Sequence, residues 1–229
     1  AREVKPNQGG RQLPLFVDLA GKECLVVGSG SLATEKTRLL LDFGAKVTVL
    51  ASVHPKELSV LQELYSGCSI VSKSFGDYEL LGVTLIVSAT ENSEDDIVIA
   101  NTAIAAGIPV NVVDNRALST FSFPAIVDRG SIQLGIGSNG KSPSLVTKLK
   151  DDLELSLPQN LGSIADFISQ MRPVVKEILP ALETRRKFWR RFLEGESADL
   201  FFSNKNNIEY TDVVNLVKQV MSEGNITRL

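Results

Sequence analysis

The sequence predicts an α/β fold in which a parallel sheet comes first and a small β element and helices follow. A glycine-rich turn joins a strand-like run to a helix-like run within Cys24–Phe43. Strand-like and helix-like segments then alternate as far as Asp114, which is the pattern of a parallel, doubly wound sheet. The alternation stops there, so the rest of the chain requires a different architecture.

The turn has the spacing of the dinucleotide-binding fingerprint, with alanine in the last place. Gly28 can adopt the unusual dihedral angles of a tight turn. Gly30 has no Cβ, so a diphosphate can approach the backbone, and Ala33 is small enough for the helix to pack on its strand. The amino terminus of that helix offers N–H groups and partial positive charge to the diphosphate. The alternative is a purely structural turn, but we expect a dinucleotide to bind at Gly28, Ser29, Gly30, Ser31, Leu32 and Ala33.

A second strand is expected at 46–50, directly after Gly44, which suits the carboxyl-terminal cap of the preceding helix. Ala51 and Ser52 follow this strand. Fingerprint proteins carry Asp or Glu at this place to bind the adenosine ribose, or Arg for a 2′-phosphate. This sequence has neither, so the motif itself does not distinguish NAD from NADP, although Ala51 and Ser52 are still expected to line the cofactor site.

Three further strands are expected at 69–72, 83–88 and 108–113, with helices at 54–65 and 94–106 between them. Ligands of parallel sheets bind outside the carboxyl ends of the strands. The residues that we assign to the cofactor from this edge are Ala89, Thr90 and Val112.

The segment after Asp114 predicts a β-hairpin with strands at 121–127 and 131–137. A polar loop follows at 138–144, in which Pro143 is expected to start a helix. The remainder is expected to be helical. Breaks are expected at Pro158, Pro173, Pro180 and Gly195, and a final amphipathic helix from Thr211 to about Glu223.

The composition is that of an ordinary globular protein, with 43% hydrophobic and 22% charged residues among 229 and a net charge of −3. This charge argues against nucleic acid as the main partner. No apolar run approaches the ~18 residues of a membrane span, and the polar start lacks the core of a signal peptide. We therefore expect a cytoplasmic enzyme. Cys24 and Cys68 are expected to be buried free thiols, and His54 has no partners for a metal site.

Several motifs together make the chain resemble the precorrin-2 dehydrogenase and sirohydrochlorin ferrochelatase family, which includes the amino-terminal module of sirohaem synthase. The resemblance covers Leu13 to about Glu194, and residues after about Gly195 match poorly. The motifs occur in the family's order, and they are LPLFVDL, VVGSGSLATEKTRLLLDFGAKVTVLAS, SAT, NVVD, FSFPAIVDRG, GSNGKSP and ETRRKFWRRF.

The resemblance implies an NAD-binding Rossmann domain at 1–115, a β dimerisation element at 116–146 and a helical domain at 147–229. It also implies a homodimer, and a two-stranded hairpin alone is only marginally stable. The implied activity is oxidation of precorrin-2 to sirohydrochlorin with NAD⁺. Some members of the family also insert Fe²⁺ or Co²⁺ into the tetrapyrrole.

The family's active-site aspartate matches Asp114, whose role would be that of a proton acceptor; the alternative is a turn-forming aspartate. The implied substrate carries eight carboxylates, so its pocket should offer cations and N–H donors. Arg129 and Lys148 are further candidates among the cations. The residues assigned to the substrate are Asn111, Arg116, Phe121, Ser138, Asn139, Gly140, Lys141 and Ser142, and Ser138 matches a phosphorylatable serine of the family.

Three functions remain open from the sequence. The first is an NAD-dependent tetrapyrrole dehydrogenase, and the second adds ferrochelatase activity to it. The third is a non-catalytic module that senses a nucleotide. The basic run 185–191 resembles a nucleic-acid patch, but the helical spacing of its aromatic residues favours a packed amphipathic helix.

Overall fold

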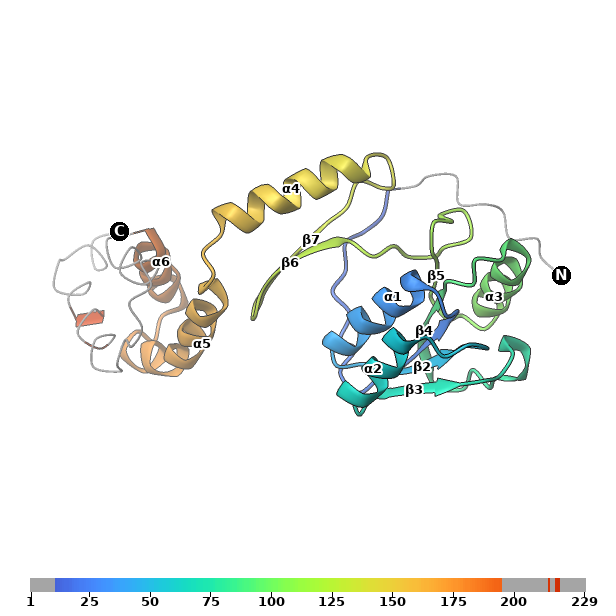
Figure 1. The fold of residues 1–229 in the computed structure, drawn as a ribbon. Coiled ribbons are helices and arrows are strands. Elements are labelled where there is room, and N and C mark those ends of the chain that lie inside the picture. The colour runs from blue at the N-terminus through green and yellow to red at the C-terminus, as the bar shows by residue number, and fades with distance from the viewer. Residues whose placement is uncertain (1–10, 195–213, 215–216, 219–229) are drawn as a thin grey trace. The chain divides into compact units, whose positions relative to one another are not determined.

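The structure is a computed structural model that describes residues 11–194, together with residues 214, 217 and 218 (Figure 1). The expected break at Gly195 and most of the expected final helix lie outside the described residues. The chain divides into two compact units. The first runs as far as Pro124 and includes Asn139–Lys141, and the second comprises Ala125–Ser138 and the chain from Ser142 onward.

The first unit contains a five-stranded sheet in the order β3-β2-β1-β4-β5, and every pairing in it is parallel. Because the order reverses between β1 and β4, a topological switch point lies at their carboxyl ends. This confirms the expected Rossmann-like parallel sheet. The strands are β1 Glu23–Val27, β2 Lys46–Leu50, β3 Cys68–Val71, β4 Val83–Ser88 and β5 Val110–Val112.

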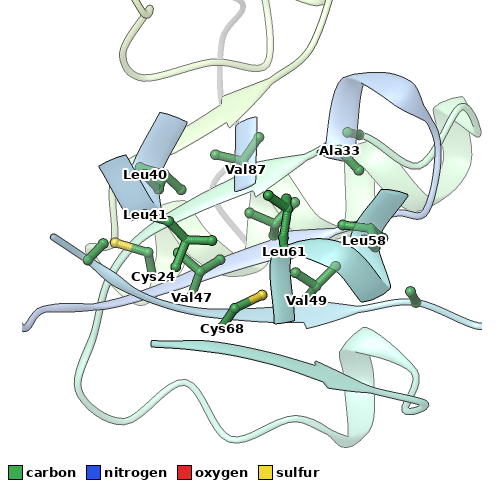
Figure 2. Close-up of a cluster of buried hydrophobic side chains, with 14 of the residues drawn as sticks. Cys24, Ala33, Leu40, Leu41, Val47, Val49, Leu58, Leu61, Cys68 and Val87 are labelled. Atoms are coloured by element: carbon green, nitrogen blue, oxygen red, sulfur yellow. The ribbon is translucent and has the colours of Figure 1, made fainter. Parts of the chain in front are cut away.

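Helices cover both faces of this sheet. On one face, α1 (Ser31–Asp42) and α2 (Lys56–Leu64) bury an apolar cluster against the strands. Figure 2 shows Leu58 and Leu61 of α2 beside the valines of β2 in this cluster. On the other face, α3 (Ser93–Ala105) packs against β4 and β5, and the short 3₁₀ helix η1 (Phe75–Asp77) precedes β4. Both cysteines are free and buried in the first cluster, as expected.

Strand β5 is shorter than expected because its ends are set by two special residues. Pro109 has no N–H to donate before the strand. Asp114 has a φ of 58°, which turns the chain away after the strand. The Val113 N–H still donates to the carbonyl oxygen of Ser88 at 2.9 Å, so the segment that precedes Asp114 is anchored to β4.

The outer edge of β5 is covered by residues 119–121. The Val112 N–H donates to Ser119 Oγ at 2.9 Å, and the Val110 N–H donates to Thr120 Oγ1 at 2.8 Å. The Asn111 side-chain amide donates to the carbonyl oxygen of Phe121 at 3.0 Å. Because these bonds satisfy the donors of an edge strand, they stabilise the position of β5 and of the residues that follow it.

The hairpin of the second unit consists of β6 (Ala125–Arg129) and β7 (Ile132–Ile136), paired antiparallel. The two-residue turn starts at Gly130, whose φ of 71° suits the first position of a tight hairpin turn. The first strand therefore begins later than the expected 121, because residues 119–121 bond to β5 and Pro124 has no N–H.

Helices α4 (Pro143–Ser156) and α5 (Leu161–Ile178) pack on the hairpin. Arg129 of β6 is buried and forms an ion pair with Glu154 of α4, with 2.7 Å between Nη1 and Oε2. A Cβ on Gly162 of α5 would lie 1.7 Å from the carbonyl oxygen of Arg129, so only glycine permits this approach. The hairpin and these helices thus share one packed unit.

Pro173 lies inside α5 rather than breaking it, contrary to the expectation. The helix continues because its apolar face packs against α6 (Leu182–Glu194), which outweighs the lost hydrogen bond. Phe188 and Phe192 of α6 are buried in this core, so the basic run 185–191 is a packed amphipathic helix, as expected. Val217 is also buried there.

Candidate active site at the carboxyl edge of the sheet

Gly28, directly after β1, is required by the packing of the turn itself. Its φ is 132°, and its N–H donates to the carbonyl oxygen of Leu50 at 3.0 Å. A Cβ at this position would lie 2.0 Å from the carbonyl oxygen of Ala89, which follows β4. The backbone of the turn therefore packs directly against the residue that follows β4, and this packing requires glycine whether or not a ligand is bound.

Gly30 has a different role, because its backbone is not strained. It is the N-cap of α1, with a φ of −77° that any residue adopts, and no described side chain caps the helix there. The N–H groups of the first turn of α1 therefore have no side-chain acceptor among the described residues, and they suit a diphosphate. Ala33, in the last place of the fingerprint, is fully buried under α1.

The side chain of Glu91 lies over Gly30, which the sequence did not suggest. A Cβ on Gly30 would lie 2.3 Å from Glu91 Oε1, so the carboxylate occupies the space that the missing side chain leaves. Glu91 is exposed and has a φ of 61°. Because the carboxylate is the end of a flexible side chain, it can move aside for a ligand; nothing in the sequence links position 91 to position 30.

Asp96 in the first turn of α3 organises the loop after β4. Its Oδ1 accepts from Ser88 Oγ at 2.6 Å and from Thr90 Oγ1 at 2.9 Å. Asn92 caps the helix by accepting from the Glu94 N–H at 3.0 Å. The sequence analysis named Thr90 but missed Asp96, whose acidic place at a helix start is a detectable signal.

The other cofactor candidates lie where expected in the sheet. Ala51 is buried and Ser52 is exposed after β2, and neither carries a charge. The side chain of Val112 is buried in the core on the α3 face, so a ligand can reach this residue only through its backbone. His54 lies near Ser72, with 3.1 Å between Nε2 and Oγ. No group of three or more potential metal ligands occurs in the described part of the chain.

Asp114 follows β5 on the same edge of the sheet as the glycine turn. The Asn115 N–H donates to the carbonyl oxygen of Val112 at 3.1 Å and closes the turn around Asp114. Its carboxylate is exposed, and no described donor or cation pairs with it. An unpaired carboxylate at this edge is available to accept a proton from a bound molecule.

The substrate candidates fall into two groups. Asn111, Arg116 and Phe121 belong to the first unit with the 139–141 turn, and Phe121 packs edge-to-face on Phe123 at 5.1 Å. Ser138 and Ser142 belong to the second unit, where the Ser142 N–H donates to Ser138 Oγ at 3.0 Å.

Two of the cations suggested by the sequence have structural partners instead. Arg129 is 7% exposed, and its guanidinium bonds to both the side chain and the backbone of Glu154. Lys148 is exposed on α4 and pairs with Asp152 one turn later, at 2.9 Å. A buried, paired guanidinium is held in place by its partner, so Arg129 serves the packing of the second unit.

The two thiols lack the features of reactive cysteines. Burial, and to a smaller extent the nearby charge of Glu23, raises the pKa of Cys24 to about 11. Burial also raises the pKa of Cys68. Because the thiolate is the nucleophile, neither cysteine is suited to chemistry near neutral pH.

Two parts of the chain match known protein families. Residues 15–125 match the family described as "Putative NAD(P)-binding". Residues 160–207 match the family described as "Sirohaem synthase dimerisation region". Among the described residues, no helix is both long enough and apolar enough to cross a membrane.

Curated proteins named "Siroheme synthase" are similar to most of the chain. The protein from Pseudomonas paraeruginosa is 40% identical over 187 residues, which are 82% of this chain and 40% of that protein. The protein from Zymomonas mobilis is 41% identical over 184 residues, or 80% of this chain and 39% of that protein. The chain thus spans about two fifths of the length of these relatives.

A solved structure named "SirC, precorrin-2 dehydrogenase" has the same fold, with a TM-score of 0.67 and 21% sequence identity. The similarity covers 92% of this chain and 100% of that chain. The two family matches in one chain and the identity of about 40% over four fifths of its length lead to one assignment: the chain belongs with the part of the sirohaem synthases that holds the NAD(P)-binding and dimerisation regions.

Proposed function

We propose that this chain oxidises precorrin-2 to sirohydrochlorin with NAD⁺. One observation supports the proposal most strongly. The exposed carboxylate of Asp114, which has no partner among residues 11–194, lies at the same edge of a parallel sheet as the glycine turn at Gly28. A dinucleotide on the turn and a proton acceptor after β5 are the two parts that removal of a hydride and a proton requires.

The residues at this edge fit a dinucleotide. Its diphosphate would lie on the free N–H groups of α1, with Gly30 presenting no side chain of its own. When bound, NAD⁺ accepts a hydride from the substrate. The residues that we propose to hold it are Gly28, Ser29, Gly30, Ser31, Leu32, Ala33, Ala51, Ser52, Ala89, Thr90 and Val112.

Asp114 is proposed to accept the proton that leaves the tetrapyrrole. Its exposure keeps the carboxylate accessible, and the bonds of Val113 and Asn115 to the neighbouring backbone hold it in place. We also propose that the substrate contacts Asn111, Arg116, Phe121, Ser138, Asn139, Gly140, Lys141 and Ser142.

We infer a preference for NAD⁺ over NADP⁺ from the end of β2. Ala51 and Ser52 offer no cation for a 2′-phosphate. Comparative titration of the two cofactors tests this preference. Tighter binding of NADP⁺ than of NAD⁺ would contradict it.

The direct test of the proposed function is an anaerobic spectral assay of the purified chain with precorrin-2 and NAD⁺. We expect sirohydrochlorin and NADH to form in equal amounts. NAD⁺ binding without turnover would instead support a nucleotide-sensing module. A parallel assay of sirohydrochlorin with Fe²⁺ or Co²⁺ tests the bifunctional alternative, in which Asp114 would also accept the pyrrole protons that metal insertion releases.

A further inference from the structure

Arg116 lies two residues after Asp114 and packs beneath the turn formed by residues 139–141 of the same unit. A Cβ on Gly140 would lie 2.9 Å from Arg116 Nη1 and 3.1 Å from its Cδ, so the arginine side chain lies directly against the Gly140 backbone. Asn139 and Gly140 both have positive φ, 60° and 71°. The left-handed turn thus leaves room for this guanidinium.

One edge of this guanidinium has no partner among the described residues. Its Nε and Nη2 atoms are shielded from solvent and make no hydrogen bond with the part of the chain that the structure describes. No described carboxylate forms an ion pair with Arg116. Buried donors on a charged group that lack an acceptor are costly, and native structures rarely leave them so without a reason.

The unsatisfied edge has the shape that carboxylates bind. The Nε–H and one Nη2–H bond point in parallel from the same side of the planar group, so two oxygens of one carboxylate can accept both. Arg129 differs in degree, because both of its terminal nitrogens bond to Glu154 or to the Asp128 carbonyl oxygen and only its Nε lacks a described partner.

We propose that Arg116 binds a peripheral carboxylate of the tetrapyrrole through its Nε–Nη2 edge. This proposal rests on the proposed function, since it assigns one contact of that substrate. Two residues of extended chain span at most about 7 Å, so the backbones of Arg116 and Asp114 are close together. By holding one peripheral carboxylate, the contact limits the orientations that the macrocycle can take in the site.

The first test measures the Kd of sirohydrochlorin, the stable reaction product, for the whole chain and its variants. We expect Arg116→Met to weaken binding about 10- to 100-fold, the scale of a two-point charged hydrogen bond. Arg116→Lys should restore only part of the affinity, because an ammonium group is a point charge without the fork. Full affinity in Arg116→Met would overturn the proposal.

Lys46→Gln is the matched control for the loss of one positive charge. Lys46 is exposed at the start of β2, at the opposite end of the sheet, and its only described ion pair is with Glu23 at 3.6 Å. We expect this variant to bind sirohydrochlorin as the unchanged chain does. An equal loss in Lys46→Gln and Arg116→Met would show a general charge effect and would overturn the assigned contact.

A second readout does not depend on the substrate. Because the unsatisfied donors destabilise the free protein, Arg116→Met should raise Tm by about 2–4 °C without ligand. A lower Tm would mark Arg116 as a structural residue and overturn the proposal. Failure of the proposed function can be distinguished from failure of the Arg116 contact. If the proposed function is wrong, the unchanged chain itself will neither bind sirohydrochlorin nor oxidise precorrin-2.

Discussion

At the residue scale, backbone strain marks the site. The non-glycine residues with positive φ in the described part of the chain are Glu91, Asp114 and Asn139. Each left-handed residue of this kind costs on the order of 1 kcal/mol, and such strain tends to collect at functional positions. Two of these residues follow β4 and β5, and the third lies in the turn against Arg116. The sequence cannot show such strain, because asparagine and the acidic residues also occupy ordinary turns.

Glu91→Gln should tighten the binding of NAD⁺. Its carboxylate lies over Gly30, where we place the negatively charged diphosphate. Two like charges at ~4 Å repel by about 1 kcal/mol in water, so we expect the Kd for NAD⁺ to fall about 3- to 10-fold in a calorimetric titration.

Glu94→Gln is the control, since Glu94 is also exposed but lies in the first turn of α3. We expect this variant to bind NAD⁺ as the unchanged chain does. Weaker binding in Glu91→Gln would mean that the carboxylate holds the cofactor, for example through a ribose hydroxyl, and would contradict the repulsion that we describe.

At the element scale, two glycines in the turn between β1 and α1 have different roles: Gly28 is needed for folding, and Gly30 is needed for NAD⁺ binding. Gly28→Ala places a Cβ 2.0 Å from a backbone oxygen at a φ of 132°. We expect a loss of about 2–4 kcal/mol in the free energy of unfolding. Gly30→Ala meets only the movable side chain of Glu91. It should keep the Tm but weaken NAD⁺ binding, because the added methyl group lies where the diphosphate must approach.

Thermal melting and NAD⁺ titration of both variants check this separation. Equal losses of stability in the two variants would contradict it. So would unchanged NAD⁺ affinity in Gly30→Ala, because the turn would then not hold the diphosphate.

The elements differ in how far the sequence could predict them. The strand at 83–88 and the helix start at Pro143 were predicted at their observed residues, because buried apolar runs and proline at a first turn are local signals. The start of the hairpin was not predicted correctly, because residues 119–121 form hydrogen bonds with β5 that depend on the tertiary fold. Pro173 inside α5 was missed for a similar reason, because packing outweighed propensity.

The candidate site shows the same limit. Gly28, Gly30 and Asp114 were predicted because a spacing or a family motif identifies them. The approach of Glu91 to Gly30 and of Arg116 to Gly140 depends on loops that meet only in the folded chain. No periodicity or motif in the sequence indicates which loops will contact each other in the folded chain.

At the scale of the whole molecule, we predict a homodimer. Residues 160–207 match a dimerisation region, and the two-stranded hairpin has no further strand to pair with in the described chain. A second copy could extend that sheet, which is marginal alone. Light scattering at micromolar concentration should give twice the 24.8 kDa of one chain. A mass of one chain would contradict the prediction.

The most direct test of the central claim is the rate of precorrin-2 oxidation by Asp114→Asn at saturating NAD⁺. The change is nearly isosteric, and asparagine tolerates the observed φ of 58°, so the variant should fold and bind NAD⁺ normally. If Asp114 accepts the proton, the rate of sirohydrochlorin formation should fall ~10²-fold or more. A rate near that of the unchanged chain, in a variant shown by circular dichroism to be folded, would contradict the account.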